Sequence, residues 1–311
     1  MVTIGDIEKK LLSQIADLNE VPEGLAFNYR VNGSSCERCS TENIKITDNA
    51  ERTGIDIRIK DGTVGETCYI PVAISVTGHT EKVRNDFFIG ENCDVTIVAG
   101  CGIHNTGHSE SRHDGVHRFF VGKNSKVKYV EKHYGEAEKG ADGSKIMNPE
   151  TEITLEEGSY MEMETTQIKG IDSTKRVTKA TVKENASIVI RERLLTNGTQ
   201  FAESQLDADL IGEGSSANII SRSVATDDSR ISFVSRIAGM APCSGHTECD
   251  AIIIGNAKVL AVPALDALDP DAALIHEAAI GKIAGEQLIK LQTLGLTPEE
   301  AEEEIVNGFL K

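Results

Sequence analysis

Residues 184–192, ENASIVIRE, and residues 213–223, EGSSANIISRS, share one layout: a charged residue, an Asn or Gly, a small residue, and then a strand-like run. The same triplet precedes other such runs, and its six occurrences are Asp61-Gly62-Thr63, Glu91-Asn92-Cys93, Lys123-Asn124-Ser125, Glu157-Gly158-Ser159, Glu184-Asn185-Ala186 and Glu213-Gly214-Ser215. The central positions are 27 to 34 residues apart. A repeat of strands without helices at such a period indicates a stacked all-β array.

Each position of the triplet has a physical reason. The Asn or Gly tolerates the left-handed backbone of a tight turn, and the next side chain must be small to fit between layers. Alternate residues of the following strand then bury against neighbouring coils. The period favours a β-helix between about residues 44 and 262, although the spacing alone also fits a β-sandwich or a jelly roll.

The N-terminal segment carries a different period. Ile4, Ile7, Leu11, Ile15 and Leu18 recur at steps of three and four, which predicts an amphipathic helix over residues 4–18. We expect it to end in the segment 19–23, where Pro22 is the breaker. Because stacked coils leave an edge at each end, this helix and the C-terminal helices are natural caps.

Near the C-terminus, the run 251–254 predicts a buried strand closed by the turn Gly255-Asn256, with Cys249 at its mouth, where the thiol can project into a cleft. Asp269, Pro270 and Asp271 form a helix start signal. The apolar residues that follow at helical spacing predict a helix carrying His276 and Glu277; they are Leu274, Ile275, Ala278, Ala279 and Ile283.

Two more helices are expected after that segment. The first spans residues 285–294 and ends at Gly295 in the left-handed conformation. The second opens at Thr297 with a capping box to Glu300 and Pro298 at its first position. Three short helices in succession would form a compact terminal domain.

Composition limits the classes of function. The chain has 311 residues, a formal net charge of -17, no Trp and 4% aromatic residues, which argues against a nucleic-acid partner. No apolar run approaches the roughly 20 residues of a membrane helix. The glycine-rich stretches match no phosphate-binding loop, so any ATP would be bound by another subunit.

The seven cysteines form an odd set without a disulfide-scaffold spacing, and the N-terminus lacks a secretory layout. We therefore expect reduced thiols and a cytoplasmic location. Cys36 and Cys39 form a lone Cys-x-x-Cys, for which an exposed loop between strands is the favoured interpretation over a zinc or redox site. Cys243 is a packing residue or an accessory ligand.

The most metal-like cluster by composition lies in CGIHNTGHSESRHDGVHRFF, residues 101–120. Spacings of three, four, five and four residues separate Cys101, His104, His108, His113 and His117, and would allow a mononuclear zinc or iron site. Three glycines interrupt any continuous helix there, and solvated histidines are the competing interpretation.

The C-terminal residues resemble the SufB/SufD family of iron–sulfur cluster assembly scaffolds. The motifs that carry the resemblance are Cys249-Asp250, Ile253-Ile254-Gly255, His276-Glu277-Ala278, Gly281-Lys282-Ile283, Glu286-Gln287-Leu288 and Ile305-Val306-Asn307-Gly308-Phe309. The chain differs in being short, in lacking the extended N-terminal region of longer members, and in having Ile275 where a glutamate is usual before the histidine. It is most similar to the short archaeal, SmsB-like form.

The resemblance implies a mainly β fold, a right-handed parallel β-helix over residues 25–265 between an N-terminal helix at 1–24 and a C-terminal helical domain at 266–311. It implies a non-catalytic scaffold for assembling and transferring a transient 4Fe-4S cluster, with Cys249, His276 and Glu277 as metal ligands. Thiolate would hold the cluster, while imidazole and carboxylate make weaker, exchangeable bonds.

The resemblance also implies partners. A SufC-like ABC ATPase would dock on the C-terminal helices, where Leu288, Leu291 and Leu294 are candidate contacts. A homodimer would form through the last β-helix strands, near residues 251–262, and recipient apoproteins would take the cluster. The alternative from another class is a mononuclear metalloenzyme on a β-array that uses His104, His108, His113 and His117.

Overall fold

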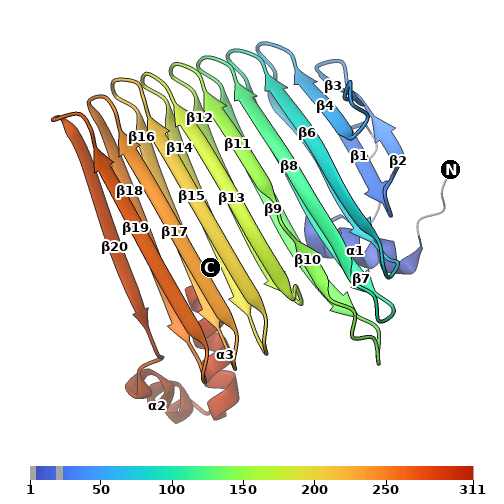
Figure 1. The fold of residues 1–311 in the computed structure, drawn as a ribbon, viewed down its shortest axis with the longest axis vertical. Helices are drawn as coiled ribbons and strands as arrows, with labels where there is room; N and C mark the ends of the chain where they lie inside the picture. The colour runs from blue at the N-terminus through green and yellow to red at the C-terminus, as the bar shows by residue number, and fades with distance from the viewer. Residues whose placement is uncertain (1–4, 19–23, 311) are drawn as a thin grey trace.

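The computed structural model describes residues 5–18 and 24–310. Its strands form two sheets that face each other in a β-solenoid of about eight turns (Figure 1). Neighbours in each sheet pair in parallel, except for the antiparallel pairs β1–β2 and β3–β4 at the N-terminal end. Stacked parallel coils identify a β-helix, as predicted, and exclude the sandwich and the jelly roll.

The first sheet, sheet A, contains in spatial order β2 (Ser34–Cys39), β1 (Ala26–Val31), β5 (Val64–Ile74), β7 (Asp94–Asn105), β9 (Lys126–Ala137), β12 (Tyr160–Lys169), β14 (Ser187–Thr196), β16 (Ser216–Ala225), β18 (Cys243–Ile253) and β20 (Ala272–Gly281). Sheet B runs β19 (Lys258–Ala267), β17 (Arg230–Gly239), β15 (Phe201–Leu210), β13 (Ser173–Val182), β10 (Lys145–Met147), β8 (Ser111–Val121), β6 (Thr80–Ile89), β4 (Gly54–Ile59) and β3 (Ile44–Asp48). β11 (Glu150–Leu155) also pairs with β8 and β13.

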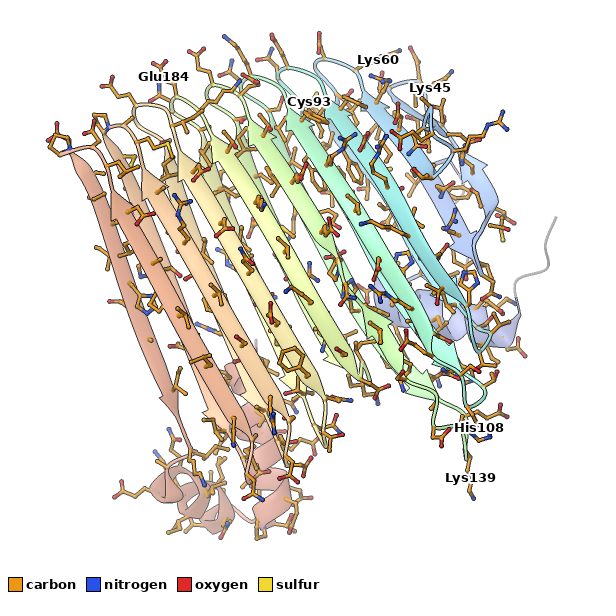
Figure 2. All side chains as sticks on the ribbon, in the orientation of Figure 1. Lys45, Lys60, Cys93, His108, Lys139 and Glu184 are labelled. Atoms are coloured by element: carbon orange, nitrogen blue, oxygen red, sulfur yellow. The ribbon has the colours of Figure 1, made fainter. Side chains whose placement is uncertain are left out.

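The predicted turns form one rim of the solenoid. Positive φ angles occur at each central position of the triplet, namely Gly62, Asn92, Asn124, Gly158, Asn185 and Gly214. Each of their amides donates to a carbonyl of the next coil, as in Gly158 N to Glu184 O at 2.9 Å. The small residues that follow are buried, and Figure 2 labels Cys93 and Glu184 along this rim. The repeat interpretation is confirmed.

Side chains that point between the sheets form the core. On the central strands buried residues alternate with half-buried or exposed ones, as on β14, and the main cluster runs along the solenoid from Ala26 to Cys249. This alternation follows from the pleat of a strand. No helix of the described residues is long and apolar enough to cross a membrane.

The N-terminal helix exists but does not cap an end. α1 (Asp6–Ala16) buries Leu11, Leu12 and Ile15 against the outer face of sheet A (Figure 1). Gly100 on β7 makes room, because a Cβ there would lie 2.8 Å from the Ile15 carbonyl. The expected role as an end cap is therefore wrong; Ile4 and the breaker segment around Pro22 lie outside the described residues.

At the C-terminal end the structure departs from the sequence prediction. The segment with the helix start signal at Asp269 is strand β20, which pairs with β18 over its whole length. Only two helices follow, α2 (Gly285–Thr293) and α3 (Pro298–Phe309). Their predicted signals are confirmed, since Gly295 has φ 98° and Thr297 forms a capping box with Glu300.

Candidate functional site

Cys249 lies in the middle of β18 and points into the solenoid. Its residue is only 1% exposed, and it belongs to the main core cluster. Placing it at the mouth of a short strand was wrong, because β18 begins at Cys243, and Ala251–Ile253 are only its last residues. The thiol is covered by the final coil of the solenoid, one strand in from the edge of sheet A.

His276 and Glu277 lie on that edge strand, β20, and face opposite sides of the sheet. His276 is in register with Thr247, which is fully buried, so the imidazole shares the inward face with Cys249. The His276 Nδ1 is buried and has no hydrogen-bond partner. Glu277 is in register with Glu248 and points outward with it. Within one chain, Cys249 and His276 are brought to one face and Glu277 is not.

The Cys249 thiol is held protonated by its surroundings. Burial raises its pKa to about 12, and the negative charges of Glu192 and Asp250 add to this effect. The side chains in register with Cys249 on the neighbouring strands of sheet A form a polar row. Its members, one on each of five successive strands, are Glu131, Thr165, Glu192, Ser221 and Cys249. Sequence analysis missed this row, which the coil period could have aligned.

A buried cation balances the carboxylates of this row. Arg176, on sheet B, donates from Nη1 to Glu131 at 2.6 Å, and its Nε lies 3.7 Å from Glu192. Burial alone would raise the pKa of Glu131, but Arg176, His133 and His117 together outweigh burial and hold that pKa well below its usual range. Burial raises the pKa of Glu192, since Arg176 and two serine donors offset it only in part.

A second group of possible ligands lies on the outer face of the same strands. His246, Glu248 and Glu277 place ligand atoms within 4.8 Å of one another. His246 Nδ1 lies 3.1 Å from Asn218 Oδ1, and its Nε2 lies 3.3 Å from Glu277 Oε2. Burial and the neighbouring Asp250 raise the pKa of Glu248. Sequence analysis did not single out His246 or Glu248.

The four histidines of residues 101–120 do not come together at one site. His104 pairs with Glu136 outside sheet A, and His108 pairs with Asp142 in a loop at the opposite rim (Figure 2). His113 and His117 point inward on β8, where His113 Nδ1 lies 3.0 Å from Glu81 and His117 Nδ1 lies 2.7 Å from the Tyr129 hydroxyl. His113 and His117 line one internal cavity with Cys101, but His104 and His108 lie elsewhere, so the predicted four-histidine metal site is wrong.

The remaining cysteines offer no second thiol cluster among the described residues. Cys36 and Cys39 lie on strand β2, not in a loop as expected, and residues three apart on a strand face opposite sides. Cys243 is 8% exposed and belongs to the core cluster, which favours its role in packing.

The predicted partner contacts lie on an exposed helix. No residue of α2 is buried; Leu288 and Leu291 are half-buried and Leu294 is 76% exposed. The adjoining last coil is also open, since no residue of β19 or β20 is buried and β20 has no strand on its outer edge within the described chain. This end of the molecule exposes an apolar edge and an apolar helix.

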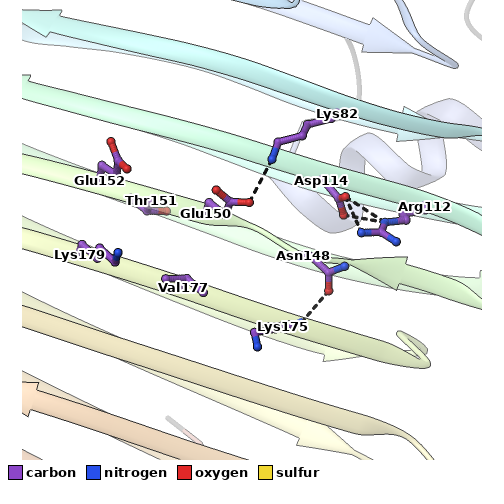
Figure 3. Close-up of a pocket in the computed structure, with 10 residues that line it drawn as sticks. All are labelled: Lys82, Arg112, Asp114, Asn148, Glu150, Thr151, Glu152, Lys175, Val177 and Lys179. Carbon is purple, nitrogen blue, oxygen red and sulfur yellow. Dashed lines mark hydrogen bonds and ion pairs between the residues drawn. The ribbon is translucent and has the colours of Figure 1, made fainter.

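A groove on the outer face of sheet B lies far from these residues along the solenoid (Figure 3). Its lining is mostly charged, but ion pairs join Lys82 to Glu150 at 3.1 Å and Arg112 to Asp114 at 2.8 Å. With these charges already paired, the groove is a weaker candidate than the Cys249 region.

Residues 75–309 match the family model described as SUF system FeS cluster assembly, SufBD core domain. Three relatives carry the description iron-sulfur cluster assembly SufBD family protein. The one from Archaeoglobus fulgidus is 31% identical over 235 residues, 74% of this chain and 61% of the relative. The one from Methanocaldococcus jannaschii is 31% identical over 227 residues, 72% and 70% of the two chains. The one from Pyrococcus horikoshii is 29% identical over 300 residues, 96% and 84%. The chain thus spans less than two thirds of the Archaeoglobus relative.

Proposed function

Because the chain belongs to the SufBD core family of the SUF iron–sulfur cluster assembly system, we propose that it is a scaffold subunit on which a cluster is built and from which it is transferred. The observation that carries this proposal is the end of the solenoid. There the Cys249 thiol and the His276 imidazole share the inward face of neighbouring strands, and His276 belongs to the outermost coil, whose strands β19 and β20 have no buried residue.

The cargo is a transient 4Fe-4S cluster, with Cys249 as the thiolate donor and His276 and Glu277 as the weaker, exchangeable donors. His276 and Glu277 lie on the two faces of an exposed edge strand, so they flank the edge at which a second chain would join. Two chains would together supply two thiols, two imidazoles and two carboxylates. Such a mixed set releases a cluster more readily than four thiolates would.

A homodimer through the last strands provides that second chain. The free edge of β20 presents backbone donors and acceptors along a run whose only strongly polar side chains are His276 and Glu277. Exposed apolar side chains surround it, with Ile275 56% exposed and Leu260 58% exposed. Edge-to-edge pairing of two copies would satisfy the backbone and cover these side chains.

Assembly requires the thiol to be uncovered and deprotonated. At neutral pH the thiol with its pKa of about 12 is almost entirely protonated, so iron must displace its proton when it binds. We assign the opening of the last coil to a SufC-like ABC ATPase that docks on α2 and α3 through Leu288, Leu291 and Leu294. The scaffold itself is non-catalytic, and recipient apoproteins take the finished cluster.

The thiols are suited to a reducing compartment. All seven cysteines are free thiols in the structure, and Cys68 and Cys101 are among the buried ones. Reduced cysteines are typical of cytosolic proteins, which supports a cytoplasmic scaffold.

Anaerobic reconstitution tests the proposal. The chain is incubated with ferrous iron and sulfide, and the cluster is measured by its absorption and by iron and sulfide content. Cys249→Ser should abolish stable cluster binding, and His276→Ala should weaken it. Cys243→Ser is the matched control, because it removes another buried thiol from the same strand and should leave the yield unchanged. A full complement of cluster in Cys249→Ser would contradict the ligand assignment.

A further inference from the structure

The outer face of sheet A carries a second donor group, close to Cys249 but on the other side of the sheet. We propose that, in the chain without a cluster, His246, Glu248 and Glu277 bind one divalent transition-metal ion that the Cys249 thiol does not ligate, so that Glu277 is shared between this site and the proposed cluster. The identification of the ion as ferrous iron in the cell rests on the proposed function. The ligation of a divalent metal ion by these three residues does not rest on it.

The first argument is the register of two carboxylates. Glu248 on β18 and Glu277 on β20 are directly opposite each other on the same face of a parallel pair. Like charges at this position destabilise a sheet. Arg222, on the next strand inward, is in register with Asp250, and its charge also acts on Glu248. A cation between Glu248 and Glu277 would turn the repulsion into attraction.

The second argument is the orientation of the imidazole. Asn218, in register with His246 on the next strand inward, accepts a hydrogen bond from His246 Nδ1 at 3.1 Å. A neutral ring held in this way directs the Nε2 lone pair outward, and the atom it meets is Glu277 Oε2 at 3.3 Å. Either a proton on the ring, which makes an imidazolium–carboxylate pair, or a metal ion bound by both atoms satisfies this contact, and the carboxylate of Glu248 within 4.8 Å favours the metal ion. A metal-binding histidine typically donates its other ring N–H to an oxygen such as that of Asn218, which fixes its tautomer and orientation.

The third argument is geometry and ligand type. Donor atoms bound to one ion at about 2.0–2.2 Å lie roughly 3 to 4 Å from one another. The separation of 3.3 Å between Nε2 and Oε2 lies in that range, and all three donors lie within 4.8 Å of each other. One imidazole and two carboxylates suit Fe²⁺, Mn²⁺ or Zn²⁺ and leave positions open for water. The set contains no sulfur, which separates it chemically from the thiol site.

The test uses the full chain without added sulfide. Purified apoprotein is titrated anaerobically with Fe²⁺, Zn²⁺ and Co²⁺, and bound metal is measured by mass spectrometry after desalting. The wild type should retain one equivalent, and its Co²⁺ spectrum should lack a sulfur-to-cobalt charge-transfer band. His246→Ala and Glu248→Gln should lose that equivalent, while Asn218→Ala should weaken affinity about 10- to 100-fold through the ring it positions.

Two controls separate this site from others. Cys249→Ser should keep the equivalent, and His108→Ala should keep it as well, because His108 forms an exposed histidine–carboxylate pair without a third donor. Failure of the wild type to retain metal, or loss of the metal in either control, would overturn the proposal. Cluster reconstitution in His246→Ala should proceed normally, so failure of the scaffold function would be detected separately.

Discussion

Alkylation of Cys249 is the most direct probe of how the fold controls its thiol. The pKa rises from an ordinary 9.0 to about 12 through burial first and the Glu192 and Asp250 charges next. Each unit of pKa changes the thiolate fraction tenfold at neutral pH. The thiolate fraction of Cys249 should therefore be about a thousandfold lower in the native chain than in the unfolded chain. Iodoacetamide, which attacks the thiolate, should therefore react at least about a thousandfold more slowly.

The pH profile follows from the direction of the shift. Below about pH 9 the native and unfolded rates should rise in parallel, since the thiolate fraction grows tenfold per pH unit in both. Above that value the unfolded rate should level off while the native rate continues to rise toward pH 12. Glu192→Gln should speed the native reaction, because it removes a negative charge that raises the thiol pKa while keeping an acceptor for the serine donors.

The assay is mass spectrometry of peptides after timed alkylation in buffer and in urea. Cys39 on the edge strand β2 is the internal control, because it is half-buried at the surface and should react in the native chain. If native Cys249 reacts within about tenfold of its unfolded rate, the thiol is not held protonated under the last coil, and the account of its burial fails.

Three further predictions concern the core, the edge and the helices. Arg176→Ala should lower the free energy of unfolding by about 3 to 5 kcal/mol, because it leaves buried carboxylates unpaired. The control in urea titrations is Arg236→Ala, whose aspartate partners are half-exposed. A loss of stability no larger than in that control would refute the prediction. Ile275→Lys should convert the proposed homodimer to a monomer in light scattering, and a dimer as stable as that of Val76→Lys would contradict the edge interface. Leu294→Asp should weaken binding of the proposed SufC-like ATPase partner about tenfold or more, with unchanged cluster reconstitution. Undiminished ATPase affinity would exclude Leu294 from the contact.

The stacked coils could be predicted because their turns depend on local chemistry. A left-handed turn residue followed by a small buried one is required in every coil, so Asn124-Ser125 and Asn185-Ala186 signal the same geometry. The signal needs no knowledge of distant contacts. The position of α1 was not predictable in the same way, because its apolar face fits the outer surface of β7 only through Gly100 and Gly102.

Strand β20 was mistaken for a helix because its residues satisfy both periods. Ala, Leu, Ile, His and Glu over 272–281 permit a helix, and Asp-Pro-Asp is a genuine start signal. Pairing with β18 decides in favour of a strand, a tertiary effect that propensity cannot include. The coil period predicts a strand at this position. Pro242 lies 28 residues after Gly214, and Pro270 lies 28 residues after Pro242, so Pro270 marks the next turn and a strand should follow it.

The same error concealed the geometry of the site. On a helix the His276 and Glu277 side chains would point about 100° apart, whereas on β20 they face opposite sides of sheet A. His246 belongs to no recognisable sequence motif. It is a candidate ligand only because Asn218 and Glu277 lie beside it on the neighbouring strands. Side-chain direction on a strand follows from register, and register requires the whole solenoid.

The end of the solenoid also explains how a docked partner could reach a buried thiol. Every interior coil is held by buried side chains on both sheets, whereas strands β19 and β20 contribute only partly buried ones, such as Leu265 and Leu274, so their coil should open at the lowest free energy. Only residues 282–284 separate β20 from α2. Under the proposed function, a force applied to α2 would therefore act first on the strand that covers Cys249, and the polar row beneath would remain in place because its strands belong to coils that stay closed.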